Sequence, residues 1–341
     1  MNYSELFYTK SYVNKDVDPR SVKELLEDGA RAGDPVCLYR TVNSTYPLEE
    51  RAEKRRELLC VLRDIAHKDR QAAYEVAMSL CKQAHDTCQG EEYMHYLMLA
   101  ADQGHLHALS FAANEYSRGL LVRRDLAKHD ALRLRAAELG DPFMQFFEGQ
   151  YWEKGTRREV DLQKAITWYE RAAAQGFHYA LEALGRLCMA EDPARAKDCF
   201  EKSISLYCHN GSYYLGVMCE DRGEIADAIT HYEQCLDKWS MEPPFEHRLI
   251  ATTGITAKAA FALGEIYRLG KSVEADMLRA IHYYSIAAYY GSKEAVEQLT
   301  AHQRTLKEPE ATYLSTALLA WHRVELLTRA IARYRQQLTG Q

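Results

Sequence analysis

Small and apolar residues recur at helical spacing along most of this chain. Residues four apart lie on one face of an α-helix, so a run of them at i, i+4 and i+8 predicts a helix with a single buried stripe. Three stretches show such a run: Ala180, Leu184, Cys188; Gly211, Leu215, Cys219; and Ala259, Leu263, Tyr267.

A second kind of helix alternates with these stretches and ends in a glycine. In "WYERAAAQG" (168–176), three alanines and two aromatic residues precede Gly176, and weaker copies end at Gly104, Gly140 and Gly291. Glycine can take the left-handed conformation that closes a helix, and an acidic side chain can cap the amides at the start. Acidic residues stand fifteen positions before the closing position at Asp125, Asp161, Asp192, Glu224 and Asp276.

The two kinds of helix together form a repeat. Gly104, Gly140 and Gly176 are 36 residues apart, and two degenerate copies fit between Gly176 and Gly291. An insertion near 240–256, which contains two consecutive prolines, interrupts the period before the last copy. Because a two-helix unit cannot bury its apolar face alone, such units stack on one another. The pattern predicts an all-α fold built from helix-turn-helix repeats.

Two segments carry a family resemblance. "DLQKAITWYERAAAQG" (161–176) and "KAAFALGEIYRLG" (258–270) resemble the Sel-one-like repeat, a relative of the tetratricopeptide repeat. The resemblance covers roughly residues 70 to 303 and implies a solenoid, that is, a right-handed α/α superhelix. Residues 192–239 depart from the pattern, so we expect local distortion of the superhelix there. The matching residues are Asp161, Lys164, Ala165, Trp168, Tyr169, Ala172, Ala173 and Gly176, then Ala259, Leu263, Gly264, Tyr267 and Gly270.

Three regions follow from the repeat boundaries. Residues 69–303 form an array of about six repeats with the insertion near 240–256. Residues 1–68 are an N-terminal helical cap region, and residues 304–341 form a C-terminal capping helix, because solenoids need polar ends. A dimer or partner helix at the C-terminus is the alternative, and the choice between monomer and dimer stays open.

Charge and composition exclude several partners. The formal net charge is −6 and basic residues do not form a separate cluster, which argues against nucleic acid. No apolar run approaches the ~20 residues needed to span a bilayer, so we expect no membrane insertion. The start lacks a secretory signal, and the nine cysteines form no CxxC pair. These features predict a cytoplasmic protein, with signal-peptide-independent secretion as the alternative.

Catalytic and ligand-binding motifs were sought and give little. "GEIYRLGKS" (264–272) resembles a phosphate-binding loop, but five residues rather than four separate its glycines. The histidines and cysteines match no metal-ligand set. We therefore predict no catalytic residue, no metal and no cofactor. A hydrolase with a Cys–His site, using Cys208 or Cys235, is the least favoured alternative.

The resemblance also implies a binding surface. In tetratricopeptide architectures the first helix of each two-helix repeat lines the concave groove, and the second helix, here the one that ends in the glycine, lies behind it. Aromatic and arginine residues on such a surface suit a protein or peptide partner. The alternative is that the rings are packed between helices. The candidate partner-binding residues are Phe143, Phe146, Gln150, Tyr179, Glu182, Arg186, Tyr213, Phe261, Glu265 and Arg268.

The sequence thus predicts a non-catalytic scaffold or adaptor that holds a polypeptide partner in its concave groove. A more specific form of this prediction is a bacterial immunity protein or chaperone for a toxin or effector. A translocated bacterial effector that acts on a host protein is the alternative outside this class. Fold alone does not choose between them.

Overall fold

The computed structural model describes residues 3–9, 18–81, 87–206, 209–237 and 251–302 of the chain. Across these residues the regular secondary structure is helical throughout, and the predicted all-α solenoid of helix-turn-helix repeats is confirmed. The chain divides into two compact units, Met1–Phe177 and His178–Gln341. Among the described helices none is long and apolar enough to cross a membrane.

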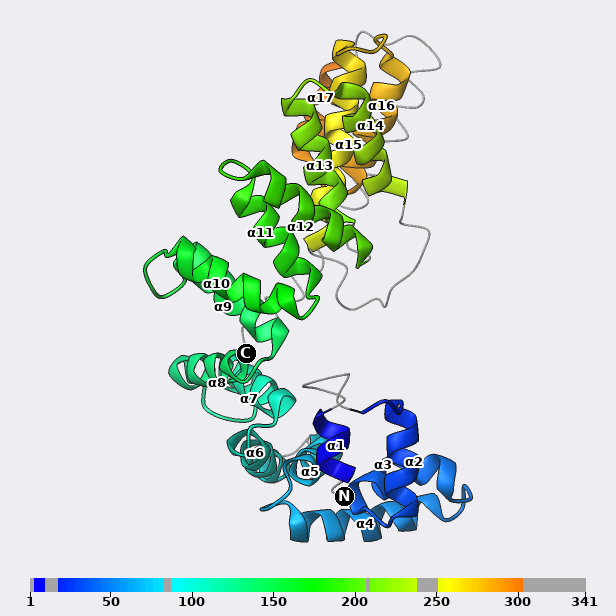
Figure 1. Ribbon diagram of the computed structural model, residues 1–341, viewed down its shortest axis with the longest axis vertical. Helices are drawn as coiled ribbons and strands as arrows, with labels where there is room; N and C mark the ends of the chain where they lie inside the picture. The colour runs from blue at the N-terminus through cyan, green and yellow to red at the C-terminus, as the bar shows by residue number, and fades with distance from the viewer. Residues whose placement is uncertain (1–2, 10–17, 82–86, 207–208, 238–250, 303–341) are drawn as a thin grey trace. The chain divides into compact units, whose positions relative to one another are not determined.

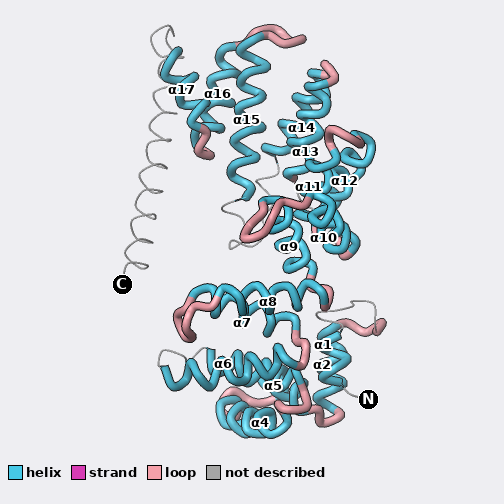
Figure 2. Tube along the Cα trace, turned by 90° about the vertical axis from the view of Figure 1, so that its left-hand side faces the viewer, coloured by secondary structure: helices cyan, strands magenta, loops and turns pink. Residues whose placement is uncertain are grey.

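The first unit contains ten helices among its described residues. Each helix from α1 to α10 contacts the next or its repeat partner, and Figure 2 shows α5 to α8 stacked side by side. The helices are α1 (Tyr3–Tyr8), α2 (Val22–Arg31), α3 (Pro35–Thr45), α4 (Arg51–Ile65), α5 (Arg70–Cys81), α6 (Thr87–Asp102), α7 (Leu106–Arg118), α8 (Leu126–Glu138), α9 (Pro142–Lys154) and α10 (Leu162–Ala174).

The second unit continues the alternation of first and second helices (Figure 1). Its first helices are α11, α13 and α15, and each contacts its neighbouring first helix as well as its own second helix. The first helices of this unit therefore form one layer. The helices are α11 (His178–Cys188), α12 (Pro193–Ser205), α13 (Asn210–Asp221), α14 (Ile225–Asp237), α15 (Ala251–Leu269), α16 (Met277–Tyr289) and α17 (Lys293–His302).

The predicted acidic caps are confirmed at the start of four second helices. The Asp161 carboxylate accepts the Lys164 amide at 3.0 Å, and Asp125, Asp192 and Asp276 cap their helices in the same way. At the other end, the closing glycines have positive φ, the region that favours glycine over other residues. The values are +80° at Gly104, +102° at Gly140, +77° at Gly176 and +93° at Gly291.

The predicted buried stripe is confirmed, because every residue of the three i, i+4, i+8 runs is buried. A glycine beside each run brings the first helix onto a ring of the second helix. A Cβ atom added to Gly216 would lie 2.6 Å from the Tyr232 ring, and one on Gly264 would lie 2.5 Å from the Tyr284 ring. Real Cβ atoms do not approach so closely, so these positions require glycine.

Two of the predicted regions lie partly or wholly outside the described residues. The predicted C-terminal helix at 304–341 is outside them, as are residues 238–250 of the predicted insertion. Residues 251–256 of that insertion are helical and form the first turns of α15. In the degenerate repeats, Cys199 and Ser203 are both buried within α12.

Candidate interaction surface

An aromatic pair recurs between the first and second helix of three repeats. In each pair a predicted site residue on the first helix packs at a tilt against a ring on the second helix, and its own side chain is half-buried. The ring therefore contributes to packing and still keeps part of its surface in solvent. The pairs are Phe146 with Tyr169 (ring centroids 5.6 Å apart, 42° between planes), Tyr213 with Tyr232 (5.9 Å, 36°) and Phe261 with Tyr284 (5.7 Å, 43°).

The tyrosines of these pairs are fixed by hydrogen bonds at their hydroxyl ends. The Tyr169 hydroxyl donates to Glu153 at 2.6 Å, and the Tyr232 hydroxyl donates to Glu220 at 3.0 Å. Burial, followed by the neighbouring Glu220 carboxylate, raises the pKa of Tyr232, so its phenol stays protonated and can donate.

The repeat at α11–α12 replaces this polar contact by an apolar one. Phe200 takes the place of the tyrosine and lies on Gly185, with the edge of its ring 2.5 Å from where a Cβ atom would stand. Met189 occupies the position of the glutamate four residues after the glycine and packs against the same cluster. Hydroxyl and carboxylate thus disappear together, as expected if each requires the other.

On α11 the predicted residues are one ring and two charges. Tyr179 is half-buried with its ring 4.2 Å from that of His178. The Glu182 carboxylate accepts the Asn210 amide at 2.8 Å, which joins α11 to the start of α13. Arg186 is exposed.

On α15 the predicted Glu265 and Arg268 lie together, 2.6 Å apart, as an ion pair. The Glu265 carboxylate also accepts the hydroxyl of Tyr284 at 2.5 Å. Burial works to raise the pKa of Glu265, but the hydrogen bonds from Arg268 and Tyr284 outweigh it, so the pKa lies below its usual value. Glu265 is therefore ionised at neutral pH, and α15 presents a paired acid and base beside Phe261.

The predicted residues of α9 belong to a phenylalanine cluster in the first unit. Phe143 is 41% exposed and meets Phe147 edge-on at 4.7 Å, while Phe177 lies 5.4 Å from Phe146. Gln150, one turn after Phe146, is half-buried. Sequence reasoning missed Phe147 and Phe177, although the run "PFMQFF" at 142–147 was a visible signal.

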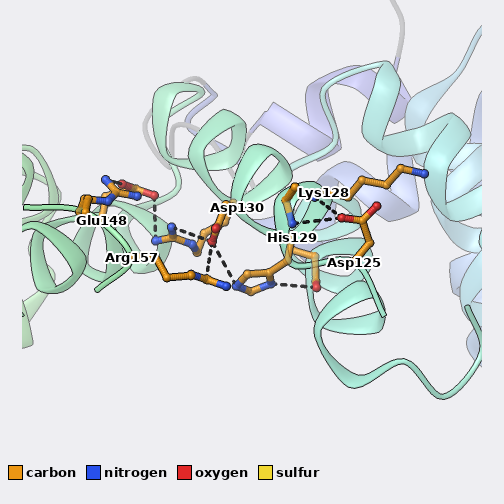
Figure 3. Close-up of polar contacts among 10 residues, drawn as sticks. Asp125, Lys128, His129, Asp130, Glu148 and Arg157 are labelled. Atoms are coloured by element: carbon orange, nitrogen blue, oxygen red, sulfur yellow. Dashed lines mark hydrogen bonds and ion pairs between the residues drawn. The ribbon is translucent and has the colours of Figure 1, made fainter. Parts of the chain in front are cut away.

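Sequence reasoning also missed a buried charge network between α8 and α9 (Figure 3). Arg133 is 3% exposed and Glu148 is fully buried, and the Nη1 and Oε1 atoms of these two side chains are 2.8 Å apart. Arg158 reaches the other Glu148 oxygen at 3.0 Å. Asp130 pairs with Arg157 at 2.6 Å and with Arg133 at 3.4 Å.

The same network includes aromatic and capping contacts. The Arg133 guanidinium lies 3.7 Å from the centre of the Tyr151 ring, a cation–π contact away from bulk water. Beside Asp130, His129 donates Nδ1–H to the Ala113 carbonyl at 2.9 Å (Figure 3). At the start of the same helix, Asp125 caps the amide of Lys128 at 3.0 Å.

The network stands at positions that are apolar in the other repeats. Glu148 occupies the place of Leu184, Leu215 and Leu263, and Arg133 that of Tyr169, Phe200, Tyr232 and Tyr284. Burying two charges costs desolvation energy that their attraction only roughly offsets, so such pairs are weak contributors to stability. Their best-attested role is to specify which surfaces pair.

The cysteines and glycines that the sequence offers as candidates for catalysis or phosphate binding contribute to the packing or the ends of helices where the structure describes them. Within the described ranges, no group of three or more His, Cys, Asp or Glu side chains could hold a metal ion. Cys208 lies outside the described residues, and Cys235 is buried. In the segment that resembles a phosphate-binding loop, Gly264 lies under the Tyr284 ring and Gly270 follows α15 with a φ of +66°.

A shallow hollow of about 530 Å³ lies between the second helices α14 and α16. The Tyr283 hydroxyl donates to Glu233 across it at 2.8 Å. The hollow is therefore on second helices, whereas the predicted site residues are on first helices. Its lining residues are Glu233, Leu278, Arg279, His282 and Tyr283.

Comparison with known proteins gives the same repeat. The Sel1 repeat matches residues 145–177 and 257–292, which contain most of α9–α10 and α15–α16. A Sel1 repeat protein from Oxalobacter formigenes has a similar structure, with a TM-score of 0.55 and 20% identity over 72% of this chain and 96% of that one. This likeness shows a shared fold.

Two further solved structures are similar at lower scores. A protective antigen of uropathogenic Escherichia coli with the same kind of repeat fold has a TM-score of 0.37 and 16% identity, over 95% of this chain and 94% of that one. An immunity protein from Pseudomonas aeruginosa has a TM-score of 0.36 and 20% identity, over 65% of this chain and 81% of that one.

A scaffold of Sel1 repeats is typical of proteins that interact with other proteins, and its helices here carry partly exposed aromatic and charged side chains. The two matched segments, the repeat geometry around Gly149 and Gly264, and the shared fold agree with one another. The chain therefore contains Sel1 repeats at residues 145–177 and 257–292, in an α-solenoid fold that it shares with a Sel1 repeat protein.

Proposed function

We propose that this protein is a non-catalytic adaptor that holds a polypeptide partner against the layer formed by α11, α13 and α15. The observation that carries the proposal is that these first helices contact one another and bear partly exposed rings beside charged groups. The other predicted residues, Phe143, Phe146 and Gln150, lie on α9 of the first unit and form a separate candidate surface there. In its specific form the partner is a toxin or effector, and the protein is its immunity protein or chaperone.

The chemistry of the layer favours a polypeptide over other ligands. Tyr213 and Phe261 have partly exposed rings, while Arg186 and the Glu265–Arg268 pair carry charges of both signs. Rings that are already held by packing lose little conformational freedom on binding, which makes them effective anchors. Charges of both signs fit a polypeptide with mixed side chains better than a uniformly anionic polymer.

The proposal is tested by capture with matched variants. The protein is used as bait in its native host, and the recovered partner is then titrated against Arg186→Glu and Tyr213→Ala. The controls are Gln234→Glu and Tyr289→Ala, at exposed positions on second helices. We expect the first pair to weaken binding at least about ten-fold and the controls less than about two-fold, as for anchor and peripheral residues. Unchanged binding by folded Arg186→Glu and Tyr213→Ala would refute the proposed surface.

The immunity or chaperone role needs its own measurement. The recovered partner is expressed in a sensitive host with and without this protein. Growth restored by the wild type but not by Arg186→Glu supports immunity. Equal growth with and without this protein contradicts the immunity or chaperone role. The adaptor role is then decided by the titration alone.

A further inference from the structure

The short helix α1 lies on first helices of the opening repeats. It contacts α3 and α5, which also contact each other, and it packs against α2. Phe7 and Tyr8, at its end, are each 1% exposed. Six residues are too few to form a stable helix alone in water, so α1 owes its conformation to the surface beneath it. We call this surface, formed by Arg40, Arg70, Tyr74, His105 and the α6–α7 turn, the α1 seat.

The Tyr8 hydroxyl is bound by backbone groups of the α6–α7 turn. It donates to the Gly104 carbonyl at 3.1 Å and accepts the Leu106 amide at 3.0 Å. These are groups at the end of one helix and the start of the next, where the helical hydrogen-bond pattern leaves donors and acceptors unfilled.

The next repeat satisfies the equivalent carbonyl from within the array. There the Gly140 carbonyl accepts the side-chain amide of Gln175, the residue just before Gly176, at 2.9 Å. The residue just before Gly140 is Leu139, which lies beside Gly104 but has no hydrogen to donate. The residue that donates in the next repeat is therefore apolar at this turn, and the Tyr8 hydroxyl donates to the carbonyl in its place.

Two arginines recognise the rest of the segment. The Arg70 guanidinium lies 3.9 Å from the centre of the Tyr8 ring and pairs with the Glu5 carboxylate. Arg40 lies 4.5 Å from the centre of the Phe7 ring. Cation–π contacts of this kind are strongest where water is excluded, as it is at these buried rings.

Two stacked aromatic side chains, His105 and Tyr74, complete the α1 seat. The His105 ring lies 4.8 Å from that of Tyr8 and stacks on Tyr74 at 4.2 Å. The α1 seat thus reads a carboxylate, an aromatic ring two residues later and a phenol directly after it. This is the chemistry of a peptide ligand, with anchors, a charge clamp and a backbone hydrogen-bond pair.

We propose that the α1 seat is a second peptide-binding site, which residues 3–8 fill in cis and which takes in trans a short segment with a carboxylate two residues before an aromatic pair. This site is on the first unit and does not depend on the function proposed for α11, α13 and α15. A tethered segment has an effective concentration on the order of millimolar. The tether therefore keeps free peptide at micromolar concentration from binding the wild type.

The test uses the full chain and a labelled synthetic peptide of residues 1–9, followed by fluorescence anisotropy. We expect the Phe7→Ala/Tyr8→Ala protein to bind this peptide at least ten-fold more tightly than the wild type does. The same peptide carrying Tyr8→Ala should bind at least ten-fold more weakly. A folded double variant that binds neither peptide, or both equally, overturns the proposal.

A milder variant keeps the test valid if loss of two buried rings unfolds the first repeats. Leu139→Gln gives the array the donor found in the next repeat, at a side chain that is 46% exposed. It should compete with Tyr8, speed hydrogen exchange of residues 3–8 several-fold and permit peptide binding. The control is Leu134→Gln, at a side chain that is 37% exposed on α8, the helix that Leu139 follows. If Leu139→Gln shows the same hydrogen exchange of residues 3–8 and the same peptide binding as the control, the proposal is overturned.

Discussion

The contact between α8 and α9 and the contact between α14 and α15 use the same repeat positions with opposite chemistry. Between α14 and α15, Leu263 and Tyr232 are buried in one apolar cluster. Between α8 and α9 the equivalent positions hold Glu148 and Arg133, buried and paired. The helical backbone is the same in both places, so either chemistry can build the repeat, provided both positions change together.

The two solutions differ in what the loss of one residue does. An apolar contact loses the area buried and gains a cavity, and its surroundings relax in part. A buried ion pair that loses one member leaves the other charge in the interior without compensation. The α8–α9 contact is therefore more specific than the α14–α15 contact without being more stable.

The largest expected effect is from Glu148→Leu, which installs the residue of the other repeats but strands Arg133. We expect the free energy of unfolding to fall by about 3–5 kcal/mol, measured by urea denaturation of the full chain. Arg158, which is 24% exposed, can return to water and adds little. An unchanged midpoint would show that Arg133 finds another partner and that the α8–α9 contact is not specified by its charges.

The close ring contacts of the apolar repeats give the next effect. Gly216→Ala and Gly264→Ala each force a methyl group into a tyrosine ring, so we expect a loss of about 1–3 kcal/mol. Gly254→Ala, in the same helix as Gly264, meets no atom of the described residues within 4 Å and should gain up to about 1 kcal/mol from helix propensity. Thermal unfolding of the three variants measures these changes in stability. A change of the same sign in all three would contradict the account.

A buried neutral group sharpens the contrast with the buried charges. Burial lowers the pKa of His105 to about 2, so the native state keeps it neutral while the unfolded chain protonates near pH 6.5. Since the unfolded state then binds more protons, stability present above pH 6.5 is lost as the pH falls below it, by up to about 1.4 kcal/mol per pH unit. His105→Asn keeps a capping side chain and should flatten this profile in urea denaturation between pH 4.5 and 7. If the stability of His105→Asn falls as steeply with pH as that of the wild type, His105 is not the group responsible.

The smallest effect concerns the hydroxyl ends of the ring pairs. Tyr232→Phe removes the hydrogen bond to Glu220 and should cost about 0.5–1.5 kcal/mol. Adding Glu220→Met reproduces the Phe200 and Met189 arrangement and should recover part of that loss, apart from the Lys271 contact of Glu220. An unchanged melting temperature for Tyr232→Phe would show that the hydrogen bond between Tyr232 and Glu220 does not stabilise the fold.

Local signals in the sequence were enough to predict the repeat. Asp161 and Gly176 act at helix ends through contacts a few residues away, and the apolar stripe at Leu263 follows helical period. The α8–α9 network was missed because Glu148 and Arg133 look like exposed charges unless their positions are aligned with Leu184 and Tyr169. One sequence also cannot show that the two changes belong together.

The α1 seat was missed for a different reason. Tyr8 and Gly104 are 96 residues apart, and no periodic pattern connects them. Residues 1–68 show weak periodicity, so they were assigned to an N-terminal cap region as a whole. The site residues on α11, α13 and α15 could be named only because equivalent positions of a related repeat line a groove. The packing of Tyr213 against Tyr232 and of Phe261 against Tyr284 joins residues from different helices, which no local sequence signal indicates.

A double-mutant cycle on Arg133 and Glu148 tests the central claim most directly. The claim is that positions which depart from the repeat do so as coupled pairs. Unfolding free energies are measured for the wild type, Arg133→Tyr, Glu148→Leu and the double variant, which restores the residues of the other repeats. The account predicts that the double variant is more stable than either single variant, with a coupling energy above about 2 kcal/mol. Additivity within about 0.5 kcal/mol would contradict it.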